Sequence, residues 1–126
     1  MTNVHYLANL ALVSKKVRNA KLYKNYFKDF YKSLDAKTKA KVNWTIKLIE
    51  HHEVVPIEYF KKLTDSDDIW EIRVRQGSNA YRILCFFDKG QLIILENRFQ
   101  KKTNKTPKTE IVKAERIKKE YFNEKE

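Results

Sequence analysis

The sequence is poor in residues that interrupt or cross-link a chain. It has a single cysteine, Cys85, so no intramolecular disulfide can form, and this suits a reducing compartment such as the cytoplasm. Its two glycines and two prolines predict few, short loops. We find no glycine-rich phosphate loop, no nucleophile elbow and no Cys/His spacing of a zinc site. We therefore expect neither a cofactor nor a bound metal.

Long hydrophobic runs are also missing. The apolar stretch at residues 6–13 is too short to cross a bilayer. It has neither the basic segment before it nor the small-residue cleavage site after it that a signal peptide needs. No basic amphipathic segment offers the wide apolar face that anchors a helix at a membrane surface. We expect a cytoplasmic protein with no membrane partner.

Acidic residues are outnumbered, because 27 Lys and Arg stand against 16 Asp and Glu and give a formal net charge of +11. Such a charge attracts polyanions, of which nucleic acid, bound in a salt-dependent manner, is the commonest. Apolar residues still make up 42 % of the chain, enough to support a folded core. A length of 126 residues gives room for one domain. We expect it at residues 16–126, after an extension or short helix at residues 1–15.

Three segments have apolar residues at helical spacing. They predict helices at residues 26–34, 36–51 and 109–122. Asp35 is well placed to cap the second helix, because a carboxylate at this position accepts hydrogen bonds from the first free backbone amides.

Strand patterns are concentrated between the second and third helices. Residues 69–75 alternate sharply, residues 80–87 are almost wholly apolar, and residues 91–99 follow a tight turn. A weaker strand is predicted at residues 17–22, and residues 59–63 are expected to form only a short bridging segment. The order β-α-α-β-β-β-α indicates a single α+β domain. In it, two N-terminal helices pack on a small, twisted, mainly antiparallel sheet that a C-terminal helix completes.

Cations recur on the neighbouring strands of this predicted sheet. Arg73 and Arg75 share one strand face because side chains alternate with a period of two, and the hairpin brings Arg82 beside them. Lys101 and Lys102 follow the last strand directly. We expect these five cations to meet in one patch that grips phosphate, although a solvated basic face is the alternative. Arg82 stands alone in an apolar strand, where a charge needs a partner or a function.

Such a patch suits RNA cleavage without a metal. The 2′-hydroxyl of RNA attacks the adjacent phosphate, and cations stabilise the charge that develops there. The proton acceptor stays open. His51 and His52 are neighbours at a helix end and face different directions, whereas Glu71 and Glu96 are equally suited to pair with an arginine. Cys85 is expected in the core rather than as a nucleophile.

Several short segments occur in a characteristic order between Tyr59 and Ala114. They are YFKKL at 59–63, IWEIR at 69–73, YRIL at 81–84 and FQKKT at 99–103, followed by Lys105-Thr106-Pro107 and Glu110-Ile111. On these segments the chain resembles the RelE/ParE toxin superfamily, most closely its HigB-like, phage-derived branch. The resemblance extends over about residues 17–122.

The resemblance implies a compact RelE-like fold and the toxin of a bacterial type II toxin–antitoxin system. The implied activity is that of an mRNA interferase, a ribosome-dependent endoribonuclease that inhibits growth and uses no metal. The implied partners are mRNA on the ribosome and a small helix-turn-helix antitoxin bound over the basic cleft. Catalytic roles fall to Arg73, Arg82 and Lys102. We expect further RNA and phosphate contacts from Arg75, Lys101, Lys62 and Arg98.

The resemblance leaves the general base unassigned. The position of the catalytic tyrosine of RelE falls near Ile111 here, with Tyr81 and Tyr121 as possible substitutes. Two other functions stay open, because neither a fold nor a net charge settles a function. One is a ParE-like toxin that inhibits DNA gyrase by binding it, and the other is a nucleic-acid-binding module without activity. The strand cations favour RNA cleavage over both.

Overall fold

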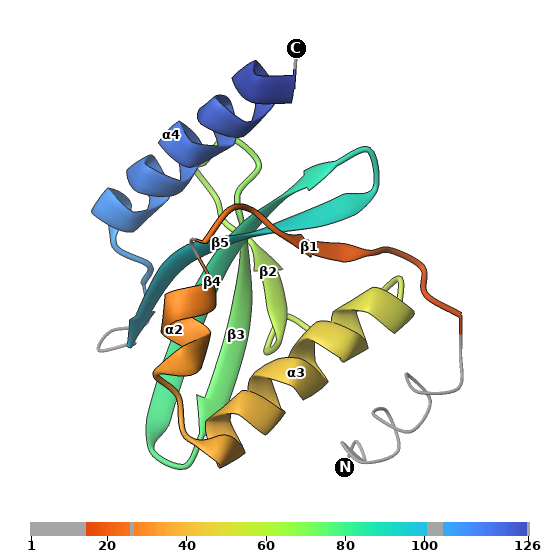
Figure 1. The fold of residues 1–126 in the computed structure, drawn as a ribbon, viewed down its shortest axis with the longest axis vertical. Coiled ribbons are helices and arrows are strands. Elements are labelled where there is room, and N and C mark those ends of the chain that lie inside the picture. Colours follow the sequence, from red (N-terminus) through yellow and green to blue (C-terminus); the bar gives the residue numbers. More distant parts are fainter. Residues whose placement is uncertain (1–14, 26, 101–104, 126) are drawn as a thin grey trace.

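The computed structural model describes residues 15–25, 27–100 and 105–125, and for residues 96–100 it describes the backbone. The described part is a mixed α+β structure with a five-stranded sheet and three helices (Figure 1). Most of the predicted N-terminal extension, residues 1–14, lies outside the described residues. Within the described ranges, no helix has both the length and the apolar composition needed to span a membrane.

The sheet has the strand order β1-β5-β4-β3-β2. β1 (Ala20–Leu22) runs parallel to β5 (Gln91–Gln100). The other pairs are antiparallel and join β5, β4 (Asn79–Asp88), β3 (Trp70–Gln76) and β2 (Phe60–Lys62). The sheet is therefore mainly antiparallel, as predicted.

Two of the short strands differ from the sequence-based expectation. β2 was expected to be only a bridging segment, and this was wrong, because Phe60 pairs with Ile72 and Lys62 with Trp70. Three residues are too few to show the alternation that identifies a strand, and the pairing with β3 determines their conformation. The predicted strand at residues 17–22 is shorter than expected, because only its last three residues form β1.

The helices lie on both faces of the sheet. α2 (Lys28–Lys32) and α3 (Ala36–His51) pack in the core on one face, and α4 (Lys108–Lys125) packs in the core on the other (Figure 1). α3 begins where the sequence predicts, and the Asp35 carboxylate accepts a hydrogen bond of 2.7 Å from the Thr38 amide. α2 is shorter at both ends than the predicted range 26–34, and α4 extends at both ends beyond the predicted range 109–122.

The alternation in β3 and β4 assigns each side chain to one of these faces. Ile72, Val74, Ile83 and Cys85 pack on the side of α2 and α3. Leu84 and Phe86 pack on the side of α4. β4 is thus buried on both faces, as expected for a central strand.

The β3–β4 hairpin turns at Gly77, whose φ of 61° is in the left-handed region that favours glycine. Its register places Arg73 directly opposite Arg82 and Val74 opposite Tyr81. Directly opposed residues share a sheet face, so the two arginines lie together on the side of α4.

Candidate functional site

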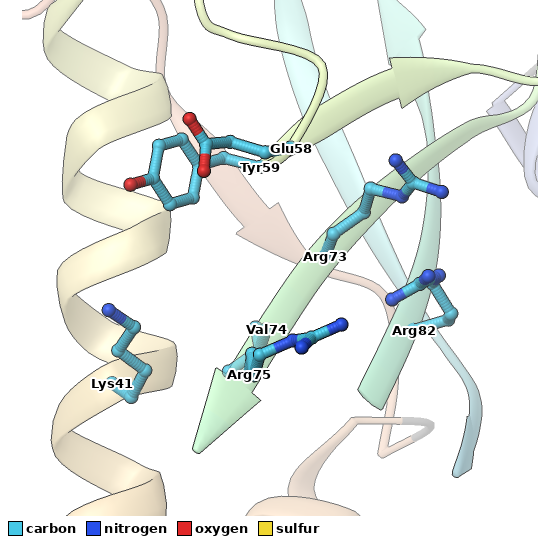
Figure 2. A pocket seen from close by; sticks show the side chains of 7 residues that line it. All are labelled: Lys41, Glu58, Tyr59, Arg73, Val74, Arg75 and Arg82. Atoms are coloured by element: carbon cyan, nitrogen blue, oxygen red, sulfur yellow. The ribbon is translucent and has the colours of Figure 1, made fainter. Parts of the chain in front are cut away.

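A cavity of about 440 Å³ lies at the free edge of β3, beyond the end of its pairing with β2 (Figure 2). Its lining comes from β3, β4, α3 and the segment before β2. The lining residues are Lys41, Glu58, Tyr59, Arg73, Val74, Arg75 and Arg82. The structure therefore brings together three of the cations that the sequence singled out, Arg73, Arg75 and Arg82.

The remaining predicted site residues are placed differently or not described. Lys62 on β2 is not among the cavity residues, and its Nζ lies 2.9 Å from a carboxylate oxygen of Asp68. Arg98 belongs to β5, where it pairs with Ile83 through the backbone, but its side chain is outside the description. Lys101 and Lys102 lie outside the described residues.

The buried side chain of Glu71 contacts two of the arginines that line this cavity. Its carboxylate is 1 % exposed, and its Oε2 atom lies 3.1 Å from Nε of Arg73 and 3.4 Å from Nε of Arg82. Both arginines thus contact the same carboxylate oxygen through their Nε atoms. The structure therefore makes Glu71 an arginine partner, one of the two roles that the sequence left open.

The second carboxylate oxygen of Glu71 holds the segment that leads to α4. Thr106 donates its hydroxyl hydrogen to Oε1 of Glu71. This contact joins the arginine pair to residues 105–107, which follow the basic pair Lys101-Lys102 in sequence. Nothing in the sequence assigns a role to Thr106, because a contact between residues 35 positions apart leaves no local pattern.

The cavity has an excess of positive charge on its β3 wall. Arg73, Arg75 and Arg82 bring three positive charges to this wall, and the buried carboxylate of Glu71, which contacts Arg73 and Arg82, balances one of them. Arg75 is exposed and has no ion pair or hydrogen bond with its side chain among the described residues. The pKa of Arg82 is lowered because burial removes water, although Glu71 raises it; Arg73 and Arg75 lower it further. A bound anion relieves this repulsion.

The opposite wall of the cavity has a different chemistry. Tyr59 packs edge to face against Trp44, with ring centroids 5.4 Å apart. Lys41 of α3 lies with its Nζ 4.5 Å from the centroid of the Trp44 ring. Burial, and then the charge of Glu58, raise the pKa of the Tyr59 hydroxyl, which therefore keeps its proton at neutral pH. Sequence reasoning missed this wall, because nothing local relates Lys41 of a helix to Glu58 and Tyr59 of a loop.

The other candidate acid–base groups whose side chains the structure describes lie outside the cavity lining. His51 ends α3 and His52 follows it. Tyr121 donates a hydrogen bond of 2.6 Å to Asp88, which raises its pKa to about 12. Tyr81 packs on the opposite sheet face, against Phe30. Cys85 is fully buried, and burial raises its thiol pKa well above the usual value, so it is a core residue.

The fold and the cavity define a class of protein, a small basic α+β protein with an arginine-lined cavity at the edge of its sheet. Residues 29–119 match the family described as "Phage derived protein Gp49-like (DUF891)". The chain belongs to this family, which is part of the RelE/HigB-like toxin superfamily. Neither a curated protein nor a solved structure matches the chain at a significant level.

Proposed function

We propose that this protein is the toxin of a type II toxin–antitoxin system and acts as a ribosome-dependent mRNA endonuclease. The observation that carries the proposal is the convergence of Arg73, Arg75 and Arg82 on one cavity with unbalanced positive charge. Membership of the Gp49-like family supports a toxin-like module. The formal charge of +11 supports a polyanionic substrate.

In the proposed reaction, the RNA supplies its own nucleophile. The 2′-oxygen forms a bond to the adjacent phosphorus, and the bond from phosphorus to the 5′-oxygen breaks. The products are a 2′,3′-cyclic phosphate and a 5′-hydroxyl. The proton of the 2′-hydroxyl passes to a base, and the departing 5′-oxygen takes up a proton.

Each arginine has a defined task in this reaction. Arg73 and Arg82 face Glu71 through Nε. One terminal nitrogen of each donates to a backbone carbonyl, at 3.1 Å for Arg73 and 3.4 Å for Arg82, so the other terminal nitrogen remains to hold the non-bridging oxygens of the phosphate. Donors fixed in advance stabilise the charge of the transition state without reorganising during the reaction. Arg75, which is exposed, extends the contact to the RNA backbone. Lys102 is proposed as a further catalytic cation and Lys101 as a further phosphate contact.

The proposal includes two partners. One is mRNA in the ribosomal A site. The other is a small helix-turn-helix antitoxin that covers the basic cavity. An antitoxin bound there is expected to carry acidic side chains for the arginines, since charge complementarity governs such contacts.

Induced expression followed by mapping of mRNA 5′ ends tests this function. We expect growth arrest with new 5′-hydroxyl ends inside coding regions that are being translated. The matched control is Arg116→Ala, which removes an exposed arginine of α4 outside the cavity and should leave cleavage intact. Growth arrest with altered DNA supercoiling and no new 5′ ends would instead indicate a gyrase inhibitor and would overturn the proposal.

A further inference from the structure

The wall of the cavity formed by α3 and the segment before β2 is unsuited to a phosphate alone. It presents the Tyr59 ring, the Glu58 carboxylate and the Lys41 amine, whereas the β3 and β4 wall presents guanidinium groups (Figure 2). An aromatic ring offers a stacking surface and a carboxylate accepts hydrogen bonds, and both are features of sites that bind nucleobases.

We propose that Tyr59 and Glu58 form a nucleobase subsite, in which the base next to the arginine-bound phosphate stacks on Tyr59 and donates a hydrogen bond to Glu58. The inference rests on the proposed function and deepens it, because it names the substrate as single-stranded RNA with an accessible base edge. A base paired in a duplex has its Watson–Crick edge occupied and its faces stacked on its neighbours.

The size of the cavity fits this ligand. Its volume of about 440 Å³ exceeds what a phosphate group fills. It falls in the range of roughly 300–1,000 Å³ that is typical of pockets for small organic ligands. The cations on the β3 wall and the aromatic ring on the α3 wall therefore fit the two halves of one nucleotide, its phosphate and its base.

Tyr59 is held in place before any ligand arrives. Its ring is half-buried and rests edge to face on Trp44. Its backbone carbonyl accepts a hydrogen bond of 2.8 Å from the Arg73 amide, which ties the tyrosine to the strand that bears the arginines. A stacking surface fixed in this way loses little conformational entropy on binding.

Glu58 is exposed, and its carboxylate lies on the Tyr59 side of the cavity rather than beside the arginines (Figure 2). Among the described residues it has no hydrogen-bond or ion-pair partner. A carboxylate left unpaired in a cavity with four cations is available to accept hydrogen bonds from a ligand. Amino-bearing bases such as cytosine supply the matching donor.

Binding of oligonucleotides that resist cleavage tests the subsite separately from the reaction. The probes are a short fluorescein-labelled oligocytidylate with 2′-O-methyl groups and an abasic oligonucleotide with the same backbone, compared by fluorescence anisotropy at low salt. We expect wild-type protein to bind the oligocytidylate more tightly than the abasic probe. Tyr59→Leu should lose roughly tenfold or more in affinity for the oligocytidylate and keep its affinity for the abasic probe, whereas Tyr59→Phe should resemble wild type.

A second measurement does not depend on how well a Tyr59 variant folds. The protein has two tryptophans, so Trp70→Phe leaves Trp44 as the only one, directly behind the Tyr59 ring. Its emission should change on addition of the oligocytidylate and not on addition of the abasic probe. For the carboxylate, Glu58→Gln should reduce the preference for oligocytidylate over oligouridylate.

The outcomes separate this inference from the proposed function. The subsite is overturned if wild-type protein binds both probes equally, or if Tyr59→Leu weakens both probes by the same factor. Cleavage of mRNA would then still support the nuclease. If wild-type protein binds neither probe and produces no new mRNA 5′ ends, both proposals fail together. The matched control is Tyr31→Leu, which changes a half-buried tyrosine of α2 that does not line the cavity.

Discussion

The carboxylate of Glu71 lies 3.4 Å from Nε of Arg82, and both side chains are almost fully buried on the same face of the sheet. A charge buried without a partner is very costly, and this pair explains how an otherwise apolar central strand accommodates an arginine. The pairing also limits how the guanidinium can rotate, so Arg82 offers its remaining nitrogens in a fixed direction. The buried partner thereby makes Arg82 a rigid part of the cavity.

Replacement of this arginine should abolish activity and keep the fold. In Arg82→Ala, Glu71 retains Arg73 and Thr106 as partners, so we expect a loss of about 1–3 kcal/mol in the free energy of unfolding. Growth inhibition and mRNA cleavage should disappear, because a donor to the phosphate is gone. Toxicity is measured by induced expression and folding by circular dichroism. A folded Arg82→Ala protein with full toxicity would exclude Arg82 from the site.

Glu71 is expected to act through the arginines as a positioning residue. Glu71→Gln keeps the shape of the side chain but removes the negative charge that Arg73 and Arg82 both contact. Without this charge, the repulsion between the two guanidinium groups is no longer offset. We expect kcat for RNA cleavage to fall strongly while KM rises little, because the cavity becomes more positive and still attracts RNA.

Stability and kcat together distinguish a positioning role of Glu71 from a merely structural one. A merely structural role would lower the thermal stability of Glu71→Gln without changing kcat of the protein that remains folded. Unfolding by denaturant gives the stability change, which we expect to be about 1–3 kcal/mol, and kinetics on the folded fraction give kcat.

The hydrogen bond from Thr106 to Glu71 should matter for activity more than for stability. Thr106→Val keeps the volume and branching of the side chain but removes its donor, and so frees residues 105–107 from the arginine cluster. We expect about 1–3 kcal/mol less stability and a clear reduction of cleavage. Thr109→Val, at an exposed position in the first turn of α4, is the matched control. Equal activity of the two variants would show that the tether has no functional role.

The contact between the β4–β5 hairpin and α4 should weaken in acid. Hydrogen bonds from Lys125 at 2.7 Å and from Tyr121 at 2.6 Å lower the pKa of the Asp88 carboxyl. A folded-state pKa below the usual value of about 4 means that the ionised form stabilises the fold above that pH. This stability is lost as the pH falls through the lowered pKa.

Asp88→Asn tests this contribution. Its free energy of unfolding should fall below that of wild type at pH 7, and the difference should shrink as the pH is lowered below about 4. Urea unfolding over a pH series measures both proteins. A difference that stays constant across the series would show that ionisation of Asp88 does not contribute.

The sequence predicted the parts of this protein that depend on local pattern. α3 begins after the Asp35 cap, and β3 and β4 carry the alternating and the apolar pattern that the sequence shows. The period-two alternation places Arg73 and Arg75 on one face, since neighbouring strand residues point to opposite sides. The short strand β2 has no such pattern, and it is identified as a strand only by its pairing with β3.

The sequence by itself determined the charge of the chain, its helices and long strands, and the presence of arginines on neighbouring strands. Tertiary structure alone decided what surrounds those arginines. Pairing across the sheet set Arg73 opposite Arg82, packing placed Tyr59 and Lys41 on a facing wall, and the segment before α4 carried Thr106 to Glu71. These contacts join residues distant in sequence, and their geometry follows from strand register and from the burial of two cores, which no local periodicity encodes.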